Sequence, residues 1–319
     1  MRVSAVLVAV VSLLLSLFSL SAPEQSVSPT PVKVDFSRPV QTLYRIEVQS
    51  ARSGWSLDAA LAAGDTWAAL GDSRRALAYW EIAFSLDGRR SQVVSRLAAA
   101  YWEQEQWSSA LVMLKRLLTL DPADSTARLR LGLLQAIFDP QAAIPTLTDA
   151  GASAALLVVV PGEVSDVQRL MRVGATLAGE DDWAMAEAAF EYAASFSPTD
   201  GVATAYWGLA RDRVGKDGSA QIATAVALLP TSAPVRYLQG LHLRLVGDVV
   251  GSLEALRTAA ELDAANPAYA AELGAAYEVA GNLNAAKIWL RRAVALSADD
   301  ERFTALLEAF YQRFPTLKE

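Results

Sequence analysis

The chain has 319 residues, of which 53% are hydrophobic, so it is long enough to bury a large core. Its formal net charge is −7 and both signs are scattered, which argues against a nucleic-acid partner because no basic stretch can follow a phosphate backbone. The lack of cysteine excludes disulfides, thiolate catalysis and cysteine-ligated zinc, and the abundance of alanine and leucine favours helices.

Residues 1–22 predict a membrane anchor or a signal peptide. Arg2 precedes an uncharged run, residues 3–20, which reaches the length of a membrane-spanning helix. The Ser-Leu-Ser triplet at 19–21 could instead precede a cleavage point, although Pro23 directly behind it favours an uncleaved anchor. Both alternatives place the rest of the chain outside the cytoplasm. We therefore expect an extracytoplasmic protein of the cell envelope, either anchored with its N-terminal segment in contact with the membrane or secreted after cleavage.

Residues 23–56 predict a Pro/Ser-rich tether and a lead-in. The prolines from Pro23 to Pro39 argue against a regular helix and favour an extended spacer. The stretch from Val40 to Trp55 is either a first helix or an irregular lead-in, because its pattern does not decide between them.

From Leu57 onward the sequence repeats with a period of about 34 residues, and small and large residues recur at fixed offsets. In the clearest unit, residues 167–200, the marker residues are Gly174, Ala186, Phe190, Ala193 and Pro198. Units begin near Leu57, Ser91, Ser125, Val167, Gly201, Ala233 and Pro267. Each unit predicts two antiparallel helices. We expect the first-helix glycine to meet the second-helix alanine, because small side chains let two helix axes approach.

This pattern resembles the tetratricopeptide repeat family, whose units carry Leu-Gly, Tyr, Ala, Phe, Ala and Pro at fixed offsets. The resemblance implies an all-α fold, an α-solenoid in which antiparallel helix pairs stack into a right-handed superhelix. Residues 57–150 would form repeats 1–3 and residues 167–300 repeats 4–7. The family also implies a protein or peptide partner, while the oligomeric state stays open.

Three segments depart from the regular repeat. The third unit predicts a shortened second helix, broken by Pro140 and Pro145. Residues 151–166 fit no repeat, and their apolar run from Leu156 to Val160 is either an extra helical turn or a short buried strand. Residues 301–319 predict an amphipathic helix that caps the last repeat.

Candidate catalytic groups are few. His242 is the only histidine, so multi-histidine metal sites are excluded, and a serine–histidine–acid triad would have to use it. We expect a structural role for it, because a lone histidine lacks partners. No nucleophile elbow or phosphate-binding loop is present, and the carboxylates of residues 180–182 beside Trp183 are explained as helix caps. We predict no enzymatic activity, no metal and no cofactor, and an enzyme using clustered carboxylates is the least favoured alternative.

In the tetratricopeptide family the first helices line a concave groove, and the resemblance transfers this role to matching positions here. The groove would be largely apolar in its middle. Its candidate residues are Trp102, Leu129, Leu133, Ile137, Met171, Leu209, Arg213, Tyr237, Leu241 and Arg244. The positions that clamp chaperone tail carboxylates in other members hold no lysine, arginine or asparagine here, so that activity is not transferred.

An apolar groove predicts a protein–protein interaction scaffold that binds a helical or apolar peptide. Two alternatives stay open at this point. Residues 151–166 or the segment from Val40 could fill the groove in cis. The chain could also be an assembly factor or receptor for an envelope polymer, such as polysaccharide or pilus machinery, with Trp102 and Tyr237 as its groove aromatics.

Overall fold

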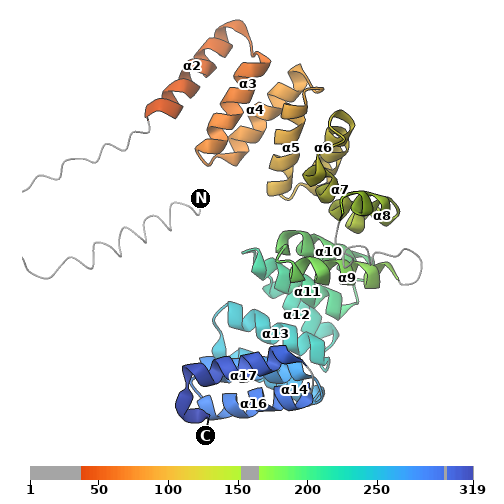
Figure 1. Cartoon of the computed structure of the whole chain (residues 1–319), viewed down its shortest axis with the longest axis vertical. Coiled ribbons are helices and arrows are strands. Elements are labelled where there is room, and N and C mark those ends of the chain that lie inside the picture. Colours follow the sequence, from red (N-terminus) through yellow and green to blue (C-terminus); the bar gives the residue numbers. More distant parts are fainter. Residues whose placement is uncertain (1–36, 152–164, 298–299, 319) are drawn as a thin grey trace, which may run out of the picture. The chain divides into compact units, whose positions relative to one another are not determined.

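The computed structural model describes residues 37–151, 165–297 and 300–318, and this part of the chain is helical without any strand. Figure 1 shows its helices following one another as antiparallel hairpins. None of the described helices is both long and apolar enough to cross a membrane. The helices are α2 (Ser37–Ser53), α3 (Leu57–Ala69), α4 (Ser73–Leu86), α5 (Ser91–Glu103), α6 (Trp107–Leu120), α7 (Ser125–Phe138), α8 (Pro140–Asp149), α9 (Asp166–Gly179), α10 (Trp183–Phe196), α11 (Gly201–Arg213), α12 (Ser219–Leu228), α13 (Ala233–Leu245), α14 (Val249–Leu262), α15 (Pro267–Val279), α16 (Leu283–Leu296), α17 (Glu301–Arg313) and the 3-10 turn η2 (Pro315–Leu317).

The chain divides into two compact units, residues 1–52 and 53–319. Helix α2 lies almost wholly in the first unit, so the stretch that the sequence left undecided is a helix. Pro39 lies within its first turn, and the expectation that the prolines up to Pro39 exclude a helix is wrong at this last position. The first turn tolerates proline because its N–H groups have no intrahelical acceptor. The predicted anchor and most of the tether lie outside the described residues.

In the second unit each first helix packs against the second helix that follows it, and most second helices pack against the next first helix. The junction between the third and fourth pairs differs, because there α7 contacts both α9 and α10. The turn inside each pair is short. In the fourth pair, α9 ends at Gly179, Asp181 adopts a φ of +64°, and the Asp182 side chain accepts a hydrogen bond from the Met185 N–H at 3.2 Å. The capping role predicted for the carboxylate at 182 is confirmed.

The first-helix glycine makes room for a large residue, and the expectation that it faces an alanine is wrong. A Cβ atom built on Gly174 would lie 2.5 Å from the ring of Phe190, four residues beyond Ala186. Glycine is needed here because the large side chain of the second helix lies directly against the first-helix backbone. The same contact recurs in five pairs: Gly64 with Trp80, Gly132 with Leu147, Gly174 with Phe190, Gly240 with Leu256, and Gly274 with Leu290.

Two of the second helices, α8 and α12, have 10 residues instead of 14. The shortening of α8 was expected, but its prolines do not break it. Pro140 occupies the first helical position, where the missing N–H is unpaired in any helix. Pro145 lies inside the helix and is exposed, so the carbonyl that it leaves without a helical donor can face water.

The third and fourth pairs share one apolar core. Residues 152–164, which include the apolar run Leu156 to Val160 predicted as a helical turn or a strand, lie outside the described residues. This core contains buried side chains of α5 to α11, among them Leu134, Ile137 and Leu170. The buried Arg169 of α9 also donates to the carbonyl oxygen of Ala136 on α7 at 2.5 Å. Helix α9 is therefore fixed against α7 by apolar packing and by a charge-assisted hydrogen bond.

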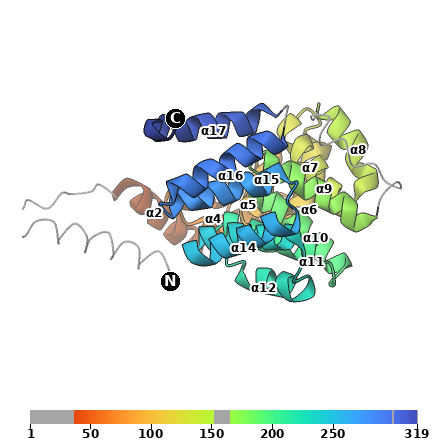
Figure 2. The same cartoon turned by 90° about the horizontal axis from the view of Figure 1, so that it is seen from below.

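The C-terminal helix α17 packs against α16, as Figure 2 shows for this end of the chain. The contact is made by Phe310, which is fully buried together with Ala286 and Leu290 of α16. The apolar face of the last repeat is thereby covered by an amphipathic helix instead of a further repeat.

Candidate functional site

The residues expected to line a groove differ widely in exposure. Ile137 has no exposed surface and Leu209 retains 7%, so both belong to the core and cannot meet a partner. The prediction that these two residues line an open groove is therefore wrong. The repeat register could not show this, because neighbouring helices cover them. Leu129 is exposed, and three half-buried residues pack on the core of the second to fifth pairs, namely Trp102, Leu133 and Met171.

A second group of predicted residues gathers around α13. Tyr237 and Leu241 pack on the same apolar cluster as Leu209. The Tyr237 ring packs on Tyr269 with centroids 4.9 Å apart and the ring planes tilted by 36°, and burial raises the pKa of the Tyr237 hydroxyl. Nearby, Arg244 forms an ion pair with Glu272 of the following repeat. The charged group of Arg244 is therefore already engaged in a contact between neighbouring repeats.

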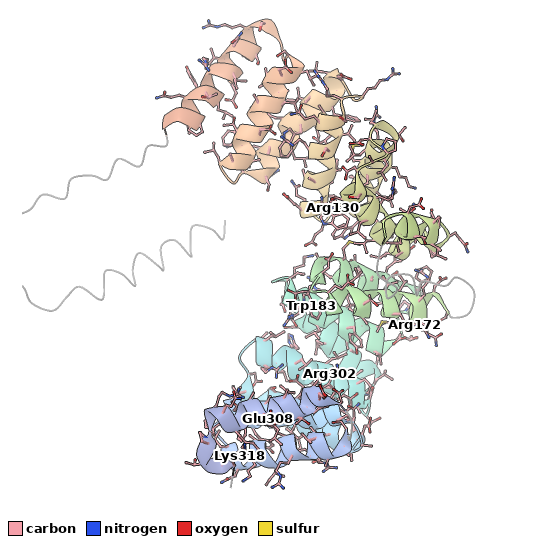
Figure 3. The ribbon with its side chains drawn as sticks, viewed as in Figure 1. Arg130, Arg172, Trp183, Arg302, Glu308 and Lys318 are labelled. Carbon is pink, nitrogen blue, oxygen red and sulfur yellow. The ribbon has the colours of Figure 1, made fainter. Side chains whose placement is uncertain are left out.

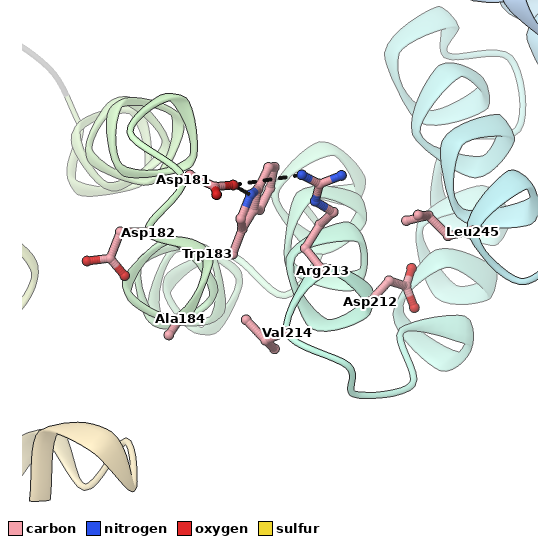
Figure 4. Close-up of a pocket in the computed structure, with 8 residues that line it drawn as sticks. All are labelled: Asp181, Asp182, Trp183, Ala184, Asp212, Arg213, Val214 and Leu245. Carbon is pink, nitrogen blue, oxygen red and sulfur yellow. Dashed lines mark hydrogen bonds and ion pairs between the residues drawn. The ribbon is translucent and has the colours of Figure 1, made fainter. Parts of the chain in front are cut away.

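Arg213 belongs to a different environment, an open pocket of about 580 Å³ beside the turn between α9 and α10. Its guanidinium group lies 4.6 Å from the ring centroid of Trp183 and 3.9 Å from the Asp181 carboxylate. The Trp183 indole N–H donates to Asp181 at 2.8 Å. Figure 4 shows these three side chains together, whereas Asp182 points away. The pocket residues are Asp181, Asp182, Trp183, Ala184, Asp212, Arg213, Val214 and Leu245.

A similar arginine–indole pair lies at Trp102. The guanidinium group of Arg130 on α7 is 5.1 Å from the Trp102 ring centroid, and Trp107 meets the same ring edge-on at 5.5 Å. Figure 3 labels Arg130 and Trp183, which mark these two arginine–indole pairs. Such pairs hold a flat aromatic surface beside a positive charge, which suits recognition of a partner that carries both apolar and acidic groups.

One packing register is thus repeated along the second unit. A first-helix glycine lies against a large second-helix residue in five pairs. Gly240 and Gly274 are one period of 34 residues apart, and Gly64 and Gly132 are two periods apart. The chain is a tetratricopeptide-like repeat protein. The all-α solenoid expected from the sequence is confirmed.

Comparisons with known proteins give structural neighbours only. No protein-family model and no curated protein matches the chain. Among solved structures, the chain is similar to the APC/C hetero-tetramer Cut9–Hcn1 at 12% identity and a TM-score of 0.39, covering 86% of this chain and 53% of that one. A tetratricopeptide repeat protein from Parabacteroides merdae matches at 12% identity and a TM-score of 0.42, covering 85% and 99%. The chain therefore spans about half the length of the Cut9–Hcn1 chain.

In this tetratricopeptide-like chain, sequence reasoning missed a charged cluster around Glu187 of α10. This carboxylate is 5% exposed, and it accepts hydrogen bonds from Arg211 at 3.3 Å and from Lys216 at 2.6 Å. Lys216 also pairs with Glu105, which lies in the turn between α5 and α6. Burial alone would lower the pKa of Lys216, but the hydrogen bonds to both carboxylates raise it overall. The cluster joins three different repeats.

The expectation that His242 lacks partners is wrong. Its ring is buried, with Nδ1 2.7 Å from Asp212 Oδ2 and Nε2 3.4 Å from Ser219 Oγ. Asp212 and His242 lie near the ends of the first helices of adjacent repeats. A signal for this contact was available in the repeat register, since stacking brings those two helix ends together.

Proposed function

We propose that the chain is a protein–protein interaction scaffold of the cell envelope, and that its first helices and adjoining turns bind a helical peptide. The proposal needs no catalytic step. A tetratricopeptide-like stack is suited to it because stacked helix pairs present a long continuous surface to a single partner.

The observation that carries the proposal is the pairing of the half-buried Arg130 and the exposed Arg213 with the indole rings of Trp102 and Trp183. Aromatic residues and arginine contribute most to binding energy at protein interfaces. Leu133 and Met171 add half-buried apolar surface on α7 and α9. The preferred partner is therefore a helix with an apolar face flanked by acidic residues, which would meet Arg130 and Arg213.

A charge reversal tests this partner chemistry. Arg213→Glu should lower recovery of the partner from a cell-envelope fraction by at least about tenfold, as expected for loss of a central arginine contact. Val250→Glu is the matched control, because Val250 is 76% exposed on α14, a helix that carries neither Trp102 nor Trp183. Circular dichroism should show the same helicity in both variants. Equal partner recovery from both variants would exclude the proposed surface.

The envelope location is a separate part of the proposal. It is supported by the uncharged run of residues 3–20 behind Arg2. An alkaline phosphatase domain fused after residue 56 should be active in living cells, because this enzyme folds only outside the cytoplasm. An inactive fusion of normal abundance would contradict the location and leave the binding surface untouched.

A further inference from the structure

The end of α11, the start of α12 and the last turn of α13 bring a carboxylate, a hydroxyl and an imidazole close together. Asp212 and His242 have side chains that are each 6% exposed. Asp212 Oδ2 lies 2.7 Å from His242 Nδ1, and Asp212 Oδ1 accepts the backbone N–H of Gly218 at 2.9 Å. With both carboxylate oxygens engaged, Asp212 holds the ring in the tautomer whose Nδ1 carries the proton. His242 Nε2 is then free to act as a base.

The hydroxyl group of Ser219 lies next to His242 Nε2. This serine is the first residue of α12, it is exposed, and its Oγ lies 3.4 Å from His242 Nε2. The Asp217 carboxylate accepts the Ser219 backbone N–H at 2.9 Å and is a second acceptor for the hydroxyl. A nucleophile and its base at this separation need only a small side-chain rotation to form the reactive hydrogen bond.

The N-terminus of α12 supplies donors for a developing negative charge. The N–H groups of a helix's first turn have no intrahelical acceptor, and in α12 they include those of Ala220 and Gln221. Ala220 directly follows the serine, which is the position that supplies an oxyanion donor in serine hydrolases with a nucleophile elbow. The positive end of the helix dipole lies at the same point.

The turn that holds Ser219 is also tightly fixed. A Cβ atom built on Gly218 would lie 2.1 Å from the carbonyl oxygen of Gly208 on α11. Only glycine allows two backbones to approach so closely, and the contact locks the start of α12 against α11. Arg211 adds a hydrogen bond to the Asp217 carbonyl oxygen at 3.0 Å. A fixed turn keeps the hydroxyl and the imidazole in register.

We propose that Ser219, His242 and Asp212 form an acyl-transfer site that hydrolyses oxygen esters able to reach the exposed Ser219. Ser219 Oγ attacks the ester carbonyl carbon while its proton passes to His242 Nε2. The ester C–O bond then breaks, and the alcohol leaves with that proton. A water molecule attacks the acyl-serine, gives its proton to His242 and releases the carboxylic acid, and Ser219 regains its proton. Asp212 stabilises the imidazolium in both steps.

A fluorophosphonate tests the site in the full chain, because this probe phosphonylates activated serines and needs no binding partner. We expect one adduct, on Ser219. It should be absent in Ser219→Ala and unchanged in Ser195→Ala, which removes another exposed serine on α10. His242→Gln should slow labelling by at least about 100-fold, as expected for loss of a general base. An absent adduct, or one formed equally fast in a folded His242→Gln variant, would overturn the proposal.

Because His242 is buried and its variant could unfold, a second test leaves the histidine in place. Ser219→Cys gives a chain with a single thiol, since the natural sequence has none. At neutral pH this thiol should react with iodoacetamide at least about tenfold faster than the thiol of Ser195→Cys, because His242 would favour its thiolate. Equal rates would show that His242 does not activate position 219. Neither result depends on the scaffold function.

Discussion

The last repeat and the fifth repeat have the same topology but are held together differently. In α15–α16 a 14-residue second helix buries Ala286, Leu290 and Ala293, and Leu290 lies against Gly274. In α11–α12 the 10-residue second helix buries only Ile222 and Ala225. Where the second helix is long, its buried apolar side chains hold the helix pair together. Where the second helix is short, polar groups take part in the junction.

The polar groups of the fifth repeat reach well beyond their own pair. Lys216 contacts Glu187 and Glu105, and Asp212 contacts His242 of the next repeat. In the last repeat Glu278 forms an ion pair with Arg313 of the capping helix α17, and this pair lies on the surface, with Arg313 53% exposed. In the fifth repeat, where the second helix is short, charged groups therefore take part in the contacts between repeats, and the buried Glu187 among them would be costly without its partners.

The largest expected effect breaks the apolar pair. Leu290→Ala should lower the free energy of unfolding by about 3 kcal/mol, because it removes a buried side chain and leaves a cavity against Gly274. Ile288→Ala, on the exposed face of the same helix, should change it by less than about 0.5 kcal/mol. Urea unfolding followed by circular dichroism measures both. Similar losses from the two changes would contradict the packing described for α15–α16.

A smaller loss should follow from breaking the charged cluster of the fifth repeat. Glu187→Gln leaves Arg211 and Lys216 without their buried partner and should cost about 2 kcal/mol in unfolding free energy. Glu272→Gln removes a carboxylate from a more exposed pair with Arg244 and should cost less than about 1 kcal/mol. The difference should persist at 1 M salt, since a buried pair is weakly screened. Equal costs would mean that Glu187 is not buried in solution.

The smallest effect concerns alkaline pH. Burial, together with the hydrogen bond to Glu81, raises the pKa of Tyr101 to about 12 from 10.0. The folded chain therefore keeps this proton more tightly than the unfolded chain, so its stabilising effect is present below pH 10 and is lost as the pH rises to about 12. Tyr101→Phe should make the unfolding free energy fall less steeply in that window. Tyrosine ionisation can be followed by absorbance as the pH is raised. If the native chain and Tyr101→Phe show the same number of tyrosines that ionise near pH 12, the raised pKa of Tyr101 is contradicted.

The sequence predicted the repeat period, the helix pairs and the cap at Asp182, because these depend on local spacing and on turn chemistry. It misplaced the partner of Gly174, since the period alone does not say which residue of the second helix faces the glycine. Lys216 and Glu105 are separated by 111 residues, and no local pattern predicts such a contact. Ile137 was misassigned for a related reason, because its burial depends on helices that pack after it.

The central claim is that the groove residues on the first helices contact a protein partner. A photo-crosslinking amino acid placed at Leu129, which is 36% exposed on α7, tests it in intact cells against the same amino acid at Ile288. The account predicts a discrete crosslinked protein from position 129 that weakens when Arg213 is changed to glutamate, and none from position 288. A crosslink from position 129 that ignores Arg213, or an identical product from both positions, would contradict it.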